Sequence, residues 1–313
     1  MDYLITQIHN YFDLQDKEDQ KWLKKSFWPS ETESNVFDIY HKWMGSPVSN
    51  PIPAESRMMF QTAKLLETAY CNIFRDMGIL VSDQGRVDMM REDIRISGYI
   101  DAIIYEGSKQ EIEKLKQVEK MSISQEDKKI LKGIIGLDIK EVPVEIKSYY
   151  GSYKDKELRE GKAQTSHLKQ LAIYMDSLDT DRGYLFYLDR GAGTSYQFIV
   201  NRKGDKFTCN SQEFNLTPIY KKWKRLYNNN ILKKVEPKSE YKYKFNIDTL
   251  DWKSQTKNAI SQARNGHKVI GDWQARYSSY FKLLIDREKT TEGYTEDELK
   301  KIAEVTKGYT AWK

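Results

Sequence analysis

The stretch VPVEIKSYYGS, residues 142–152, joins an apolar strand pattern to an aromatic and basic segment. Glu145 and Lys147 lie two positions apart within the apolar part. Because side chains alternate between the two faces of a strand, both charged groups should point the same way. Burying charges is costly unless they are paired or bind an ion. The stretch therefore predicts a buried strand that carries either a structural ion pair or a functional site.

The pattern on either side of this strand alternates between helix and strand. Apolar residues at helical spacing predict an amphipathic helix over residues 56–80, ending at Gly78. Residues 95–107 predict a strand pair or a bent strand, with Gly98 at a bulge or turn. The other predicted elements are a helix in the second half of residues 157–178, a strand over 182–190 and a hairpin over 195–210. This order indicates an α/β fold with a mixed central sheet flanked by helices.

The composition is that of a folded protein with a mild basic excess. Of the 313 residues, 39% are hydrophobic and 12% aromatic, enough for a sizeable core. The net charge of +5 permits a polyanionic partner without demanding one. Two cysteines, Cys71 and Cys209, are too few for a disulfide framework and fit a reducing compartment. Since no signal-peptide pattern or long apolar run occurs, we expect a cytoplasmic protein without a membrane partner.

Changes of pattern along the chain predict three regions. Residues 1–55 form an N-terminal helical segment, because short helical patterns alternate there with Pro, Ser and Gly. Residues 56–210 form the α/β core, and within it the Lys- and Glu-rich residues 106–140 form a solvated helical insertion. Residues 211–313 form a C-terminal helical region that packs on the core.

A third charged residue, Asp101 in GYIDAII, also lies on an apolar strand. With Glu145 and Lys147 it forms a candidate catalytic set. Two carboxylates brought close repel each other unless a cation lies between them, and oxygen ligands suit Mg²⁺ or Mn²⁺. Such an ion lowers the pKa of bound water, and Lys147 beside it can hold a phosphate oxygen or orient the water. The set therefore fits phosphodiester hydrolysis. The alternative is a structural salt bridge between a carboxylate and Lys147.

Three motifs resemble, in chain order, those of the PD-(D/E)XK nuclease superfamily, specifically its RecB-like exonuclease branch. They are GYIDAII, VPVEIKSYYG and HLKQLAIYM. That branch carries G-x-x-D on one strand, an acidic residue-x-Lys on the next, and Q-x-x-x-Y on the following helix. Here these are Gly98 to Asp101, residues 145–147, and Gln170 to Tyr174. The resemblance covers roughly residues 56–200 and implies a restriction-endonuclease-like core.

The resemblance also implies the roles of the strand residues. Asp101 and Glu145 would bind the metal with the Ile146 carbonyl, and Lys147 would position the attacking water and stabilise developing charge. Glu67, on the preceding helix, would be a further metal ligand. The alternative for Glu67 is that it caps the helix or faces solvent.

Two residues of the third motif, Gln170 and Tyr174, lie one helical turn apart. The resemblance implies that they orient the site or contact the DNA backbone. The alternative is simple packing of this helix on the sheet.

Aromatic and basic residues after the charged strand predict a DNA groove, in which bases stack and lysines meet phosphates. These residues are Tyr149, Tyr150, Lys154 and Lys156. The alternative is a plain tyrosine-rich loop. The basic and aromatic run over residues 219–244 either extends this groove or is a solvated helix face.

Many RecB-like nucleases hold an iron–sulfur cluster through four cysteines, and this chain departs from that pattern. Near the C-terminus, Ala275 and Ser278 stand where cysteines would fall. Two cysteines cannot supply four thiolates, so we expect no such cluster. Packing of aromatic residues on the core would have to replace it; these are Trp273, Tyr277, Tyr280 and Phe281.

The function implied by the resemblance is a Mg²⁺- or Mn²⁺-dependent deoxyribonuclease. We expect an exonuclease, or a nuclease acting on single strands and duplex ends, in recombination, repair or replication. A phage-type protein in a bacterial or phage-infected cell, with a recombination or replication protein as a partner, would fit. The alternatives are a structure-specific or site-specific endonuclease and a DNA-binding scaffold without catalysis.

Overall fold

The structure, a computed structural model, describes residues 4, 6–8, 10–12, 23–137, 139–241, 274–281, 283–284 and 300. The chain divides into two compact units. One unit comprises residues 25–33 and 56–227 and holds the sheet. The other comprises residues 1–24, 34–55 and 228–313.

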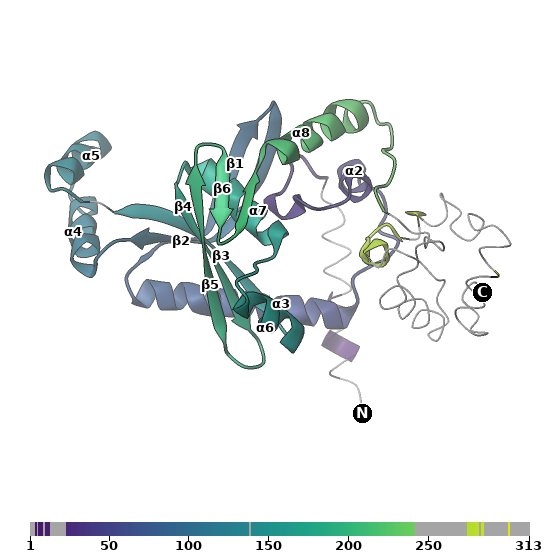
Figure 1. Cartoon of the computed structure of the whole chain (residues 1–313), viewed down its shortest axis with the longest axis horizontal. Helices are drawn as coiled ribbons and strands as arrows, with labels where there is room; N and C mark the ends of the chain where they lie inside the picture. The colour runs from purple at the N-terminus through teal and green to yellow at the C-terminus, as the bar shows by residue number, and fades with distance from the viewer. Residues whose placement is uncertain are drawn as a thin grey trace. The chain divides into compact units, whose positions relative to one another are not determined.

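A seven-stranded mixed sheet forms the centre of the first unit (Figure 1). Its strands lie side by side in chain order from β1 to β7. Their bounds are β1 Leu80–Arg91, β2 Ile94–Glu106, β3 Lys140–Tyr149, β4 Arg182–Asp189, β5 Ser195–Lys203, β6 Lys206–Cys209 and β7 Gln212–Asn215. All neighbouring pairs are antiparallel except β3 and β4, which are parallel. The expected α/β class with a mixed sheet flanked by helices is therefore confirmed, and it is consistent with a restriction-endonuclease-like core.

Two hairpins illustrate how local chemistry sets the register. Glu92 and Asp93, with φ of 49° and 63°, close the turn that pairs Arg91 with Ile94. Positive φ at both central residues is the geometry that suits the twist of a two-residue hairpin. Gly204 occupies the positive-φ region in the turn between β5 and β6, as the predicted hairpin requires.

The parallel pair needs a crossover, and α6 (Ser152–Arg159) and α7 (Thr165–Leu178) supply it. The helix predicted in the second half of residues 157–178 corresponds to α7. The segment for which a tyrosine-rich loop was the alternative to a DNA groove forms α6 from Ser152 onward. Helix α6 begins directly after Gly151, whose φ of 104° turns the chain sharply after β3.

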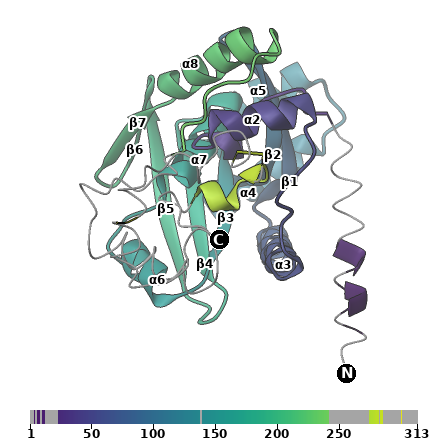
Figure 2. The same cartoon turned by 90° about the vertical axis from the view of Figure 1, so that its right-hand side faces the viewer.

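Helices α3 (Ala54–Asp76) and α7 cover opposite faces of the sheet. Alternate residues of β3 and β4, including Val144 and Ile146, pack with Cys71 and other residues of α3. The intervening positions face α7, because a Cβ placed on Gly183 would lie 3.0 Å from the side chain of Met175. Figure 2 shows α3 nearly end-on beneath β1.

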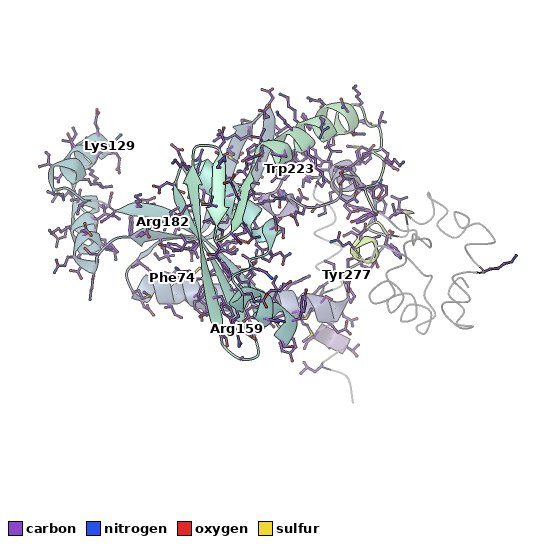
Figure 3. The ribbon with its side chains drawn as sticks, in the orientation of Figure 1. Phe74, Lys129, Arg159, Arg182, Trp223 and Tyr277 are labelled. Carbon is purple, nitrogen blue, oxygen red and sulfur yellow. The ribbon has the colours of Figure 1, made fainter. Side chains whose placement is uncertain are left out.

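The predicted insertion is a pair of helices, α4 (Lys109–Glu119) and α5 (Gln125–Ile134), between β2 and β3. The pair stands out from the sheet at the left of Figure 1, and Lys129 on α5 is labelled there in Figure 3. Ile112, Leu115 and Val118 are buried, as their spacing predicted. Most of the charged residues are exposed or half-buried, although Lys128 of α5 is buried.

The sheet unit extends beyond the predicted core of residues 56–210. Phe27 forms a parallel bridge with Ile96 and stacks on Trp223 of α8 (Thr217–Leu226), with ring centroids 5.2 Å apart. Both aromatic rings are fully buried, and Trp223 lies beneath α8 in Figure 3. The unit therefore includes a short segment from before residue 56, together with β7 and α8. Trp223 is a core residue and is not available in the predicted basic groove.

The second unit contains α2 (Val36–Met44), capped by Asn35, whose side chain accepts a hydrogen bond from the Phe37 amide at 3.0 Å. Phe37 packs in a cluster with Ala275 and Tyr280. Tyr277, by contrast, is exposed. Trp273 lies outside the described residues, as do most of the residues predicted to form the C-terminal helical region.

The bulge or turn predicted at Gly98 was wrong, and one neighbouring strand was missed. Residues 94–106 form one continuous strand, and Gly98 lies within it opposite Val87. A glycine is needed there because a Cβ would lie 2.9 Å from Pro29, in the short η1 helix (Pro29–Glu31). In addition, β1 was not predicted at all. In the described part of the chain, no helix is both long and apolar enough to cross a membrane.

Candidate active site

Glu145 and Lys147 lie on the same face of β3, as the alternation predicts, and form an ion pair. Their neighbours across the parallel pair are Leu185 and Tyr187, on the face that α7 covers. The Glu145 side chain has no exposed surface. Its Oε2 has no hydrogen-bond partner among the described residues. A buried carboxylate with an unsatisfied oxygen is costly, so this position needs an explanation beyond packing.

Asp101 lies where β2 and β3 separate. The backbone pairing of the two strands ends at Ala102 and Val144, and that register places Asp101 opposite Glu145. Beyond this point the two strands are joined through a side chain: the Oδ2 of Asp101 accepts a hydrogen bond from the Ile146 amide at 2.8 Å. The structure therefore brings Asp101, Glu145 and Lys147 together at the opening between two strands.

Glu67 reaches the same place from α3. It lines one pocket with Asp101, Ile146 and Lys147, and the pocket has a volume of about 440 Å³. The helix predicted over residues 56–80 is thus confirmed as α3, and it places Glu67 beside the ends of the strands. Its side chain is half-buried and does not face open solvent.

Burial and mutual repulsion perturb the carboxyl groups. Burial, then the Asp101 charge, raises the pKa of Glu145 to about 8. Burial and the Asp101 charge likewise raise the pKa of Glu67 to about 7. Burial also raises the pKa of Asp101, although Lys147 and the Ile146 amide oppose this effect. Carboxyl groups whose ionisation is disfavoured in this way mark a place that a cation would stabilise.

The pKa of Lys147 is raised despite its burial. Burial disfavours the ammonium, but the charges of Glu145 and Asp101 more than offset that effect. Lys147 therefore carries its proton at neutral pH and supplies a fixed positive charge to the pocket.

Sequence reasoning missed Gln84, which holds Glu67. The pairs on either side, Asp83 with Ala102 and Gly85 with Ile100, place Gln84 opposite Asp101. Its side-chain amide donates a hydrogen bond to Glu67. Its φ of 49° is in the left-handed region, which is uncommon for a residue other than glycine and often marks a functional position. No sequence signal identified it, because Gln has no strong preference for that conformation.

Arg190 is a second residue that sequence reasoning missed. It follows β4 directly, its amide donates a hydrogen bond to the Tyr149 carbonyl at 3.0 Å, and its side chain lines the pocket. The Nε is buried without a hydrogen-bond partner in the part of the chain that is described. The sequence did offer a signal for Arg190. It follows β4, and the carboxyl ends of two parallel neighbouring strands lie at the same edge of the sheet, so Arg190 must lie near the end of β3.

Gln170 and Tyr174 do not line this pocket. The Gln170 side-chain amide donates a hydrogen bond to the Tyr174 hydroxyl at 3.1 Å, and both side chains line a second pocket. Burial, then the charge of Glu145, raises the pKa of Tyr174. Tyr174 is therefore close enough to Glu145 to feel its charge, although it lines a different pocket from Asp101 and Lys147.

The four residues of the predicted DNA groove differ in their exposure and contacts. Tyr149 is buried and donates a hydrogen bond from its hydroxyl to Asp155 at 3.0 Å, so it cannot stack on a base. Tyr150 is 74% exposed. Lys154 and Lys156 form ion pairs along α6 with Glu157 at 3.1 Å and Glu160 at 3.9 Å, respectively.

The donor set fits a hard divalent cation. Among the described residues, no group of three or more His, Cys, Asp or Glu side chains is arranged to hold a metal ion. Mg²⁺, however, is commonly held by one or two carboxylates with waters and substrate phosphates. Asp101 and Glu145 supply such a pair, and the unsatisfied oxygen of Glu145 is an acceptor that a cation would use. The role of Glu67 as a metal ligand stays a prediction.

Comparisons with known proteins add little to this description. No protein-family model matches the chain. No curated protein matches it. Among solved structures, the crystal structure of SSO0001 is similar over 80% of this chain and 94% of its own, with 11% sequence identity and a TM-score of 0.42. A likeness at that score carries no argument, so the fold and the site stand on the strands and side chains of this chain.

Proposed function

We propose that this protein is a divalent-metal-dependent nuclease that hydrolyses phosphodiester bonds of DNA in the pocket between α3 and the ends of β2 and β3. One observation carries the proposal. Glu145 is a fully buried carboxylate with an unsatisfied oxygen, placed opposite Asp101 and beside Lys147. A structural role alone would not require a second carboxylate facing the first.

Asp101 and Glu145 would hold the cation, with Glu67 and the Ile146 carbonyl next to them. When bound, the ion would lower the pKa of a coordinated water and supply a nucleophile at neutral pH. Its positive charge would also oppose the burial and the Asp101 repulsion that raise the pKa values of Glu145 and Glu67. Binding of the ion and ionisation of the pair would therefore favour each other.

The cationic side chains of the pocket would hold the substrate. Lys147 is fixed by its ion pair and would stabilise negative charge on the scissile phosphate. Arg190 and Lys64 line the same pocket, and a guanidinium can bind two phosphate oxygens at once. These residues position the phosphate beside the carboxylates, which is the arrangement that in-line hydrolysis needs.

Cleavage assays with purified variants test the proposal. Labelled single- and double-stranded oligonucleotides would be incubated with Mg²⁺, Mn²⁺ or EDTA. We expect Asp101→Asn and Lys147→Ala to lower the cleavage rate by roughly 10²- to 10³-fold, because each removes a charge from the reacting centre. Lys140→Ala, an exposed lysine at the start of the same strand, is the matched control and should keep wild-type activity. A wild-type protein that cuts nothing with either ion would refute the proposal.

The products decide between modes of cleavage. Mononucleotides released from 5′- or 3′-labelled linear substrates, with closed circular DNA left intact, would support the proposed exonuclease. Nicked or linear circles and discrete bands from long duplexes would instead identify an endonuclease.

A second candidate, a DNA-binding scaffold without catalysis, is favoured by one observation. The Glu145–Lys147 ion pair and the hydrogen bond from the Ile146 amide to Asp101 already engage part of the charged set without a metal. Under this candidate, the protein would bind DNA equally well in EDTA and in Mg²⁺, and the Asp101→Asn variant would bind like the wild type.

A further inference from the structure

A second pocket, of about 450 Å³, lies in the same unit and has aromatic and basic walls. Trp28, Arg86 and Tyr99 line it together with Gln170 and Tyr174. The size is typical of a small-molecule site. Neither the carboxylates nor the lysine of the candidate active site line it, so it needs an explanation of its own.

The Trp28 wall is held rigidly. The Phe27 amide donates a hydrogen bond to the Arg95 carbonyl, and the Ser97 amide donates one to the Phe27 carbonyl, each at 2.9 Å. These bonds and the buried Phe27 ring fix the chain immediately before Trp28. After it, the buried Glu31 accepts a hydrogen bond from the Trp28 amide at 3.2 Å.

Gly98 shapes the floor between Trp28 and the sheet. A Cβ at this position would lie 2.9 Å from Pro29 and 3.8 Å from Tyr174. Only glycine lets the η1 helix approach β2 so closely. The pocket is thus formed by the backbone fold itself and does not require a rearrangement to open.

Two large aromatic side chains remain accessible at this pocket. Trp28 is 44% exposed and Tyr99 is 58% exposed. Arg86 is the direct cross-strand neighbour of Tyr99, and its side chain is 65% exposed although Asp88 lies 3.2 Å away. Exposed aromatic rings beside an arginine are the chemistry that binds nucleobases, because every base has a face that stacks on them.

The pocket adjoins the candidate active site. Tyr99 precedes Asp101 by two positions on β2, so their Cα atoms are roughly 7 Å apart along the strand. Tyr174, on the pocket wall, lies close enough to Glu145 to feel its charge. A strand that placed one phosphate beside Asp101 could therefore place a neighbouring base in this pocket.

We propose that this pocket binds one unpaired nucleobase of the substrate strand, next to the phosphate that is cleaved. This assignment rests on the nuclease function proposed above. The base must be unpaired, because both faces of a base within a duplex are covered by its neighbours. The pocket therefore makes the protein select single strands and frayed ends over closed duplex.

A binding experiment in EDTA tests the pocket without relying on cleavage. The affinity for a 12-nucleotide single strand would be measured by fluorescence anisotropy. We expect Trp28→Ala to weaken binding by roughly 5- to 100-fold, the range for loss of one stacked base. Trp28→Phe keeps a stacking ring and should retain most of the affinity. Tyr277→Ala removes an exposed tyrosine of the other unit and should bind like wild type.

An abasic scan separates stacking from misfolding, because it leaves the protein unchanged. One nucleotide at a time is replaced by an abasic residue. We expect an abasic residue at one position to weaken the binding of wild-type protein by the same roughly 5- to 100-fold. The same strand should bind the Trp28→Ala variant no more weakly than the intact strand does. If every abasic strand binds wild-type protein equally while Mg²⁺-dependent cleavage persists, the base pocket is refuted and the nuclease function stands. If the protein neither binds nor cuts any strand, both proposals fail.

Discussion

At the scale of single residues, Glu145 links stability to pH. Burial raises its pKa from an ordinary 4.5 to about 8. In this interval the folded protein keeps a proton that the unfolded chain has released. The unfolded state thus binds fewer protons, and the free energy of unfolding falls as the pH rises from about 4.5 to about 8.

Replacing Glu145 with Gln should remove this dependence. In metal-free buffer, we expect the variant to gain stability relative to wild type between pH 5 and pH 8.5, by on the order of 3 kcal/mol, since each pKa unit corresponds to about 1.4 kcal/mol. Urea unfolding followed at several pH values measures this. Glu141→Gln, an exposed carboxylate on the same strand, is the control. Parallel curves for Glu145→Gln and wild type would show that Glu145 titrates normally.

Gln84 shows what residue-level reasoning from sequence cannot reach. The three charged strand residues were identified because charge in an apolar strand is conspicuous. Gln84 lies in a polar stretch, and its importance comes from its neighbours Asp101 and Glu67, one on another strand and one on a helix. Only the pairing register of β1 with β2 places Gln84 opposite Asp101, where it can hold Glu67.

At the scale of elements, the α4–α5 pair is a nearly independent addition. Its buried apolar residues, Ile112, Leu115 and Val118, are contributed by α4, and Lys132 of α5 pairs with Glu119 at 2.5 Å. Among the described residues, a hydrogen bond from the Lys116 ammonium to the Gly78 carbonyl, at 2.5 Å, joins it to the rest of the unit. Such an element should contribute little to the stability of the sheet.

Deleting it tests this idea. Glu106 and Lys140 are paired across β2 and β3, so a two-residue Asn-Gly turn can replace residues 107–139. We expect a loss of less than about 2 kcal/mol, because one hydrogen bond and limited contact are removed. Cleavage should persist, since Asp101 and Glu145 keep their register. A soluble deletion variant without activity would show that the pair contributes to the site; thermal unfolding and the oligonucleotide assay measure both properties.

Elements were predicted well where their periodicity was strong. The apolar spacing of α3, α4 and α7 and the apolar runs of β3 and β4 made these elements recognisable. β1 was missed because its residues alternate poorly: it is an edge strand whose middle, from Ser82 to Arg86, is mostly polar. Pairing with β2, more than its own composition, makes this segment a strand.

At the scale of the whole molecule, the sheet unit is discontinuous in sequence. The segment around Phe27 lies in the core with Ile96 and Trp223, although the chain between residues 34 and 55 belongs to the other unit. A fragment boundary placed at residue 56 therefore removes part of the core.

Truncated chains should reveal this dependence. We expect residues 56–210 alone to lack a cooperative unfolding transition, because losing buried Phe27 and Trp223 costs on the order of 3 to 5 kcal/mol each. A chain of residues 25–227 keeps both rings and should unfold cooperatively. Differential scanning calorimetry compares the two. A well-folded 56–210 fragment would contradict the core described above.

By itself, the sequence determined the α/β class, the main helices and strands, and the pairing of Glu145 with Lys147 on one face. It could do so because these features follow from local periodicity within a single element. Only the tertiary structure decided that Asp101 lies opposite Glu145 where β2 and β3 separate, that Gln170 and Tyr174 line a different pocket, and that Phe27 belongs to the core. Those facts depend on register and on contacts between segments far apart in the chain, which no local pattern records.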